Sequence, residues 1–436
     1  MLSGQEFAKL GERDEVSPFS EIGVKNFKSF KEERRIKLGN LTILAGANSS
    51  GKSSFMQPLL LMKQTIEASY DPGALLLSGP NIQFTSGEQL ISKISPQENY
   101  FTVYLATSGI GLKSSFSWTP GMGFDIAEQI SEFLKVNRWI SLRPSMNSHE
   151  IQQALNLALV DNHPIDEYQV LREYCFLQFK LGVHKGIYRL TNRSFIRLLS
   201  QIIHVPALRG NPTRSYQTAA VRGTTFVGQF ESYVANIVDR FQQENSESFA
   251  QLVRAFQTLG LTDLIQTQRL NDTQIELRVG RVLGQPDHQD TVNIADVGFG
   301  VSQVLPVIVA LLVAQPGQLV YIEQPEIHLH PRAQVALAEI FADAAHRGVR
   351  VVVETHSELF LLGIQTLVAE EQLDPNLVKL HWFTRQPDGS SQVTSADLDT
   401  TGAFGDWPED FGSTALALEN RYLNAAEKQL WQTSHG

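Results

Sequence analysis

The sequence has little cysteine and no long hydrophobic run, and each absence excludes a class of protein. The single cysteine among 436 residues, Cys175, excludes an intrachain disulfide and a cysteine-based metal cluster. Apolar runs of roughly eighteen residues, the length that spans a bilayer, are missing, so we predict no contact with the membrane. The first residues lack the charged and apolar regions of a signal peptide. Together these absences predict a cytoplasmic protein.

Acidic residues are missing between Cys175 and Phe230, although the whole chain has 46 acidic residues, 36 basic residues and a net charge of −10. One interpretation is a surface that contacts the phosphate backbone of DNA. The other is a set of charges that pair with acids elsewhere in the fold, and the sequence leaves both open. Arg209 and Arg214 are also candidates for contact with nucleotide phosphates. The candidate DNA contacts are Lys180, Lys185, Arg189, Arg193 and Arg197.

A glycine-rich stretch from Gly46 to Ser53 has the form G-x-x-x-x-G-K-[ST], which is the phosphate-binding P-loop. An apolar stretch typical of a buried strand precedes it at 41–45, and a stretch that can form a helix follows. We expect backbone N–H groups to surround the phosphates, with Lys52 at the β- and γ-phosphates. The predicted ligands are ATP and Mg²⁺, with the Ser53 hydroxyl on the metal. The predicted ATP-binding residues of this loop are Gly46, Asn48, Ser49, Ser50, Gly51, Lys52, Ser53 and Ser54.

Two further apolar strands are predicted at 318–323 and 349–354, with a helix at 332–346 between them. Strand, helix and strand in this order form a βαβ unit, so the sheet is expected to be parallel here. Glu323 ends the first strand, which is the Walker B form, and is a predicted Mg²⁺ ligand. His356 lies just past the end of the second strand. Because such sites lie beyond the carboxyl ends of the strands, the P-loop, Glu323 and His356 are expected to converge.

The stretch from Asp296 to Gln303 is rich in small residues and precedes a helix predicted from about Val304 to Ala314. Exposed N–H groups at a helix start favour an anion. The candidate residues here are Gly298, Gly300 and Ser302.

Hydrophobic spacing divides the chain into four parts. Residues 19–123 hold the P-loop and several strands, and residues 259–396 hold Walker B and the histidine. Helical spacing begins at Ile126, Ile130, Phe133 and Leu134 and returns at 151–158 and 195–202, so 124–258 is predicted to be a mostly helical insertion. Residues 397–436 form a tail. The predicted fold class is α/β: a P-loop ATPase head with a mixed sheet plus this insertion.

These motifs, in this order, resemble the ABC-type ATPases. The phrases at 26–30 (Asn-Phe-Lys-Ser-Phe) and 323–331 (Glu-Gln-Pro-Glu-Ile-His-Leu-His-Pro) resemble the branch with RecF, the SMC proteins and the OLD-family ATPases. The closing phrase 406–411 is similar to the tail of small bacterial ATPases of this branch. The resemblance implies a homodimer or higher oligomer in which Gly298, Gly300 and Ser302 of one subunit close over ATP bound to another. Residues 326–331 would form the D-loop at the same interface.

The sequence departs from this family at two motifs. Residues 296–303 replace the usual L-S-G-G-Q signature. The usual Asp-Glu pair at Walker B is Glu323-Gln324, and a glutamine cannot accept a proton as a carboxylate does. Glu326 is a candidate substitute, so the predicted catalytic residues are Glu323, Gln324, Glu326 and His356. We expect slow hydrolysis, with ATP acting mainly to join subunits.

Too few residues follow His356 for the Toprim nuclease of OLD-type relatives, so any effector is expected to be a separate chain. The preferred hypothesis is a sensor or scaffold that regulates a nuclease or toxin in bacterial antiphage defence. The second is a RecF-like DNA-repair ATPase that binds duplex DNA. The third, a transporter ATPase subunit, fits the long 124–258 region less well.

Overall fold

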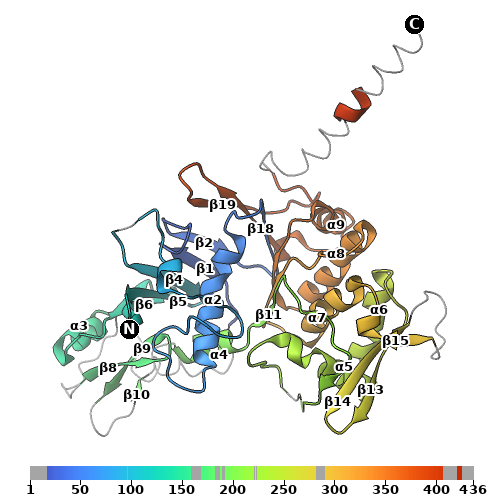
Figure 1. Ribbon diagram of the computed structural model, residues 1–436. Helices are drawn as coiled ribbons and strands as arrows, with labels where there is room; N and C mark the ends of the chain where they lie inside the picture. The colour runs from blue at the N-terminus through green and yellow to red at the C-terminus, as the bar shows by residue number, and fades with distance from the viewer. Residues whose placement is uncertain are drawn as a thin grey trace.

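The computed structural model describes residues 17–405 except 96, 159–167, 182–186, 189–191, 220, 222 and 281–289, and it also describes 420–424 (Figure 1). The phrase at 406–411 and the basic residues Lys185 and Arg189 lie outside the described residues. None of the helices in the described part of the chain has the length and apolar composition needed to span a bilayer.

A six-stranded sheet forms the centre of the molecule. Its order is β11 (Ile203–Val205), β16 (Leu319–Glu323), β17 (Arg350–Glu354), β3 (Leu41–Gly46), β18 (Val378–Arg385) and β19 (Ser391–Ala396). The first five strands are parallel and β19 is antiparallel to β18. The predicted mixed sheet, with parallel strands around the P-loop, is therefore confirmed.

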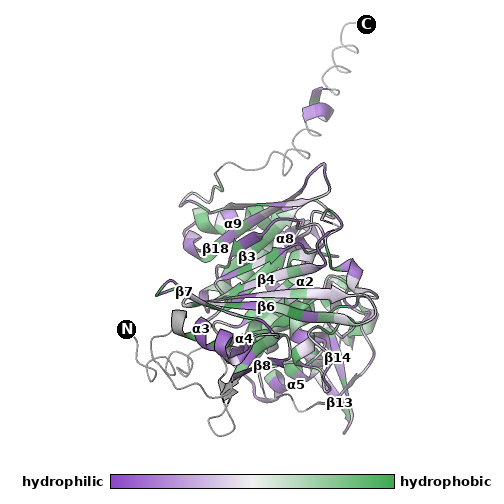
Figure 2. Ribbon diagram, turned by 90° about the vertical axis from the view of Figure 1, so that its left-hand side faces the viewer, coloured by the Kyte–Doolittle hydropathy of each residue, from purple (hydrophilic) through white to green (hydrophobic). Residues whose placement is uncertain are grey.

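Both faces of the central sheet are buried, because successive side chains on its strands enter two different hydrophobic clusters. Ile43 and Ala45 of β3 pack into one cluster with the helices of the C-terminal half, whereas Leu44 packs into the other cluster. Figure 2 shows hydrophobic segments concentrated around β3, β18 and α8. The helices of the first cluster are α5 (Val234–Gln243), α6 (Glu247–Thr258), α7 (Phe299–Val313), α8 (Pro331–His346) and α9 (Glu358–Ala369).

The opposite face packs against α2 (Lys52–Ile66) and a second, antiparallel sheet. The order of this sheet is β2 (Arg34–Lys37), β1 (Glu21–Lys25), β4 (Tyr100–Ala106), β5 (Ile110–Thr119), β6 (Gly123–Phe133) and β7 (Arg138–Leu142). Beside it lie α3 (Ser148–Ala158), α4 (Asn192–Ser200) and a three-stranded sheet of β8 (Tyr168–Glu173), β9 (Phe176–Leu181) and β10 (Ile187–Tyr188). Helices α2 and α4 lie next to each other in Figure 1.

A third antiparallel sheet lies beside α5, on the far side of the first cluster. It is built from β12 (Tyr216–Gln217), β14 (Gln274–Gly280), β13 (Ile265–Asn271) and β15 (Thr291–Asn293). Short 3₁₀ turns occur at Gly87–Gln89, Phe230–Tyr233, Ile294–Asp296 and Pro375–Leu377.

The helix predicted at Ile126–Leu134 is wrong, because this segment is strand β6 paired with β5 and β7. Its register shifts opposite Ser115 and Phe116, so the usual alternation is interrupted. Polar Gln129 and Ser131 occupy buried positions that an apolar pattern would have filled. The Gln129 side-chain amide donates to the Leu177 carbonyl and accepts from the Leu177 N–H. The buried polar residues concealed the strand.

The mostly helical insertion at 124–258 is also wrong as a description. The predicted helices at 151–158 and 195–202 are present as α3 and α4, and α5 and α6 follow them, but strands β6 to β12 lie among these helices. Strand β11 belongs to the central sheet itself, beside the Walker B strand. The region therefore forms part of the ATPase head and is not a separate helical unit.

Candidate nucleotide site

The P-loop has a backbone that requires glycine at two positions. Gly46 and Gly51 have φ angles of 135° and 110°, values that residues with a side chain rarely adopt. A Cβ atom at Gly46 would also lie closer than 3.0 Å to the carbonyl oxygen of Phe383, and one at Gly51 would lie 2.7 Å from Ser391 Oγ. Strand β18 and the start of β19 thus hold the loop from behind, and its other side is open. Ala47, Asn48 and Ser49 form the exposed part of the loop, where Ser49 has φ 61°.

Lys52 begins α2 and is buried, with 3% of its surface exposed. Its Nζ donates to the carbonyl oxygens of Gly46 at 2.9 Å and Ala47 at 2.8 Å. Burial lowers the pKa of Lys52, against the opposing effect of the carboxylates of Glu354 and Glu326. The ammonium group is therefore held against the backbone of the P-loop itself.

Ser53 contacts an acid from a different strand than Walker B. Its Oγ donates to Glu354 Oε1 at 2.7 Å, and the Tyr321 hydroxyl donates to Glu354 Oε2 at 2.9 Å. Burial raises the pKa of Glu354, and the nearby charge of Glu323 raises it further. Strand pairing explains the contact: β17 lies between β3 and β16, and Glu354 is in register with Leu44 on one side and Glu323 on the other.

The Walker B acid Glu323 is fixed by the segment after β11. His204 Nε2 donates to Glu323 Oε1 at 2.9 Å, since the carboxylate can only accept, and the N–H of Ala207 donates to Oε2 at 3.3 Å. The His204 ring also stacks on Tyr321 with 5.2 Å between ring centroids. Burial raises the pKa of Glu323, but the His204 and Ala207 hydrogen bonds outweigh burial and leave the pKa below its usual value.

Arg209 hydrogen-bonds to the backbone at the end of the Walker B strand and in α7. Its guanidinium donates to the backbone carbonyls of Gln303, Glu323 and Gln324 at 3.1, 2.8 and 3.1 Å. It therefore ties the first turn of α7 to the Walker B loop and is engaged by protein carbonyls, in contrast to the phosphate contact considered from the sequence. Arg214 instead forms an exposed ion pair with Asp296.

The loop after Walker B places its remaining polar residues toward the end of β17. Gln324 has φ 45°, and its N–H donates to the Glu354 carbonyl at 2.7 Å. Glu326 Oε1 accepts from the backbone N–H of His356 at 2.8 Å, and burial raises the pKa of Glu326. His356 is half-buried; burial and the Lys52 charge lower its pKa, while a hydrogen bond with the Gly46 backbone opposes this. Lys52, Glu323 and His356 thus meet at one sheet edge, as the sequence predicts.

The signature turn lies beside the D-loop on the molecular surface. A Cβ atom at Gly298 would meet nothing within 4 Å, and Phe299 is 52% exposed. The Phe299 ring lies 5.5 Å from that of His328, and Gly300 approaches the carbonyl of His328. Ser302 Oγ donates to the Phe299 carbonyl at 3.2 Å. Helix α7 begins at Phe299, five residues before the predicted start at Val304.

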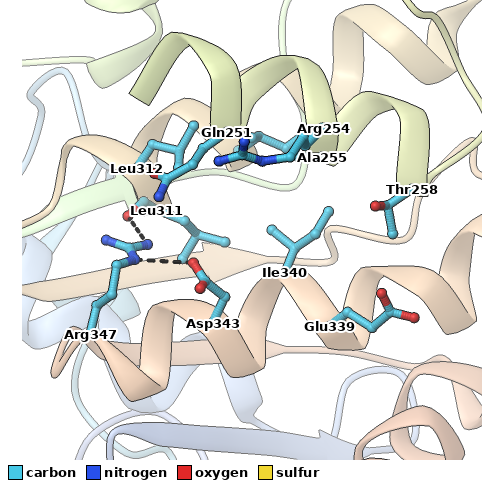
Figure 3. A pocket seen from close by; sticks show the side chains of 11 residues that line it. Gln251, Arg254, Ala255, Thr258, Leu311, Leu312, Glu339, Ile340, Asp343 and Arg347 are labelled. Carbon is cyan, nitrogen blue, oxygen red and sulfur yellow. Dashed lines mark hydrogen bonds and ion pairs between the residues drawn. The ribbon is translucent and has the colours of Figure 1, made fainter. Parts of the chain in front are cut away.

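The basic stretch is only partly described. Arg193 and Arg197 lie one turn apart on the exposed face of α4, and Lys180 belongs to β9. A separate groove of about 230 Å³ lies between α6, α7 and α8 (Figure 3). Its lining includes Arg254, Ile340 and Asp343 and none of the nucleotide-site residues above.

The residues present fit a magnesium nucleotide. A side chain would not fit at either Gly46 or Gly51, and the buried Lys52 ammonium group donates a hydrogen bond to the loop backbone. Oxygen atoms of Ser53 and Glu323 are hard ligands of the kind Mg²⁺ prefers, and the Glu354 carboxylate lies against the Ser53 hydroxyl. Among the described residues, no group of three or more His, Cys, Asp or Glu side chains is arranged to hold a metal unaided. This fold and site define a P-loop ATPase.

Two family models match the chain. One, described as "AAA domain, putative AbiEii toxin, Type IV TA system", matches residues 157–362, and an AAA ATPase domain matches residues 19–107. No curated protein matches the sequence. The matches fall on both halves of the head and include the P-loop, the signature turn, Walker B and His356. Together with the motifs in this order at one sheet edge, these matches support the predicted ABC-type ATPase of the RecF/SMC-like kind.

Solved structures similar to the chain include SMC heads. The SMC head domain from Thermotoga maritima is 11% identical, with 86% of this chain and 98% of that chain covered and a TM-score of 0.38. An SmcHead bound to the C-winged helix domain of ScpA is 12% identical, with 88% and 98% covered and a TM-score of 0.42. A third, from Pyrococcus furiosus, is 10% identical, with 87% and 96% covered and a TM-score of 0.38.

Proposed function

We propose that ATP joins two copies of this chain through composite sites, and that the joined form regulates a separate nuclease or toxin in bacterial antiphage defence. In each site the P-loop of one copy binds the nucleotide, and Gly298, Gly300 and Ser302 of the other copy close over it. The magnesium nucleotide supplies the negative charge that both surfaces recognise. The effector acts only in one of the two states, joined or separate.

The observation that carries this proposal is the position of the signature turn. Gly298 and Phe299 are exposed at the N-terminus of a fifteen-residue helix, α7, and no side chain caps that helix. Its first backbone N–H groups therefore have no intrahelical partner and are suited to a phosphate. The neighbouring D-loop residue His328 is exposed too. A second copy would cover this surface and satisfy these N–H groups through its bound nucleotide.

We further propose that hydrolysis is slow, because Gln324 stands where a carboxylate normally polarises the attacking water. An amide orients water but cannot take its proton. Glu326, the remaining acid, accepts from the His356 N–H and is 8% exposed, so it is held by the protein. In this account ATP binding serves for joining, and its hydrolysis serves as a slow timer.

The hydrolysis proposal is tested by comparing steady-state turnover of Gln324→Glu, Gln324→Ala and Glu326→Gln, with Gln372→Glu on an exposed loop as the charge-matched control. We expect Gln324→Glu to raise turnover by about tenfold or more, as an added general base does, and the control to leave it unchanged. Brisk turnover that survives Gln324→Ala and is abolished by Glu326→Gln would instead make Glu326 the base.

Regulation of a toxin is supported by the description of the model that matches 157–362, which names a toxin of a type IV toxin–antitoxin system. The chain would be purified together with the product of its neighbouring gene, and the mass of the complex measured with and without ATP. A nuclease or toxin that binds in one nucleotide state only is the expected result. A neighbour that binds equally in both states would remove the regulatory role.

A RecF-like role on duplex DNA is the second candidate, supported by the exposed Arg193 and Arg197 on α4. It predicts DNA affinity that falls steeply with salt and is lost in the double variant Arg193→Glu/Arg197→Glu. The matched control is reversal of Arg138 and Arg143, two exposed arginines outside the acid-free stretch. If both double variants bind DNA like the parent, the basic stretch does not contact DNA.

A further inference from the structure

Glu354 is a buried carboxylate that belongs to none of the motifs recognised in the sequence. It ends β17, two residues before His356, and is 3% exposed. One of its oxygens accepts from the hydroxyl of Ser53, the P-loop residue that ligates magnesium in proteins with this motif. Within the described residues, the carboxylate of the Walker B acid Glu323 accepts hydrogen bonds from His204 and Ala207, and Ser53 bonds to Glu354 instead.

Both oxygens of Glu323 are already engaged by the chain. Oε1 accepts from His204 and Oε2 accepts from the N–H of Ala207. The ring of His204 is itself held by stacking on Tyr321. The Walker B acid is thus held by residues of β11 and the segment that follows it.

Glu354 occupies the strand between these two elements. In the register of the central sheet it is the direct neighbour of Leu44 on β3 and of Glu323 on β16. Its second oxygen is fixed by the Tyr321 hydroxyl at 2.9 Å. The Tyr321 hydroxyl therefore holds one oxygen of Glu354, and the other oxygen accepts from the Ser53 hydroxyl. These two hydrogen bonds fix the orientation of the Ser53 side chain, which is the predicted magnesium ligand.

We propose that Glu354 is the carboxylate that positions the Ser53 hydroxyl for Mg²⁺, with Tyr321 orienting Glu354 and His204 holding Glu323 as the second acid. This inference rests on the proposed nucleotide site and deepens it. Glu354 is a positioning residue: its effect on the metal passes through the Ser53 hydroxyl. Two acids from adjacent strands then share a role that a single Walker B acid usually fills.

The test separates metal binding from nucleotide binding. Affinity for a fluorescent ATP analogue is measured in Mg²⁺ and in EDTA, and binding of Mn²⁺ in the presence of ADP is followed by electron paramagnetic resonance. For Glu354→Gln we expect the gain in affinity that Mg²⁺ provides to fall by about tenfold or more, with affinity in EDTA within about twofold of the parent. Glu339→Gln, an exposed change of the same kind on α8, should match the parent.

Two further variants keep the test decisive if Glu354→Gln does not fold. Glu354→Asp keeps the charge but shortens the side chain, and is expected to lose the Mg²⁺-dependent gain as well. Tyr321→Phe removes the hydrogen bond to the second oxygen of Glu354 but leaves the contact with Ser53, and it should lose less of the gain. A full Mg²⁺-dependent gain and normal Mn²⁺ binding in folded Glu354 variants would overturn the inference. A parent protein that binds no nucleotide in either buffer would instead overturn the nucleotide site itself.

Discussion

Replacement of Lys52 by methionine is the most informative single change at the P-loop. The Lys52 Nζ donates to the carbonyls of Gly46 and Ala47, so phosphate binding would exchange these neutral acceptors for charged ones. An opposite unit charge about 4 Å away contributes about 4 kcal/mol at an effective dielectric constant of about 20. Allowing about 1 kcal/mol for the carbonyl bonds that are lost leaves about 3 kcal/mol.

That free energy corresponds to about a hundredfold weaker binding of ATP in Lys52→Met. The assay is thermal unfolding with and without ATP, supported by direct titration. At an ATP concentration of about one hundred times the parent Kd, the nucleotide stabilises the parent by about 2.7 kcal/mol. The variant, near half saturation at the same concentration, gains only about 0.4 kcal/mol.

Lys93→Met is the matched control, because the Lys93 side chain is 80% exposed and its Nζ lies 4.0 Å from the Glu88 carboxylate, a separation too long for a hydrogen bond. We expect this variant to retain the full stabilisation by ATP. If Lys52→Met were stabilised by ATP as strongly as the parent and the control, the P-loop would not be the nucleotide site and the reasoning above would fail.

Three further predictions concern the frame around the site. Gly46→Ala should lower the free energy of unfolding by about 3 kcal/mol, because Gly46 has a φ of 135° and a Cβ atom there would clash with Phe383. Gly210→Ala is the control, because a Cβ atom at Gly210 would meet nothing within 4 Å, and it should leave the free energy of unfolding unchanged. Urea unfolding of both variants checks this prediction. Burial lowers the pKa of His381 to about 4, so the unfolded chain takes up a proton at a higher pH than the folded protein does. The free energy of unfolding is therefore full above pH ~6.5 and falls by about 2 kcal/mol at pH 5. His381→Gln should flatten this pH profile. Arg209→Met should cost about 2–4 kcal/mol in urea unfolding, since three backbone carbonyls lose a charged donor.

The convergence of Lys52, Glu323 and His356 was predictable from the sequence, because parallel strands present their carboxyl ends at one edge of a sheet. The strands themselves were recognisable as short apolar runs that end in polar residues. Helix α8 was predictable as the helix between the two apolar strands of a βαβ unit.

The residues that fix Glu323 were not predictable. His204 lies 119 positions away in the sequence, on a three-residue strand too short to show a pattern, and only β11 pairing with β16 brings it to the acid. Glu354 ends a strand without belonging to any recognised motif, and its contact with Ser53 depends on strand order. Segment β6 was mistaken for a helix because Gln129 and Ser131 are buried polar residues.

The central claim, that two copies complete each other's site, is tested most directly by mixing two inactive variants and measuring mass in solution with Mg²⁺ and ATP. Lys52→Met removes the P-loop contact but keeps the signature turn. Gly298→Glu adds a negative charge at a position with φ −60° and open space, so the fold is preserved while the signature turn is blocked. We predict that the parent dimerises, that each variant alone stays monomeric, and that the mixture forms dimers with one chain of each kind. Dimers of Gly298→Glu alone that are as stable as the parent's would contradict the account.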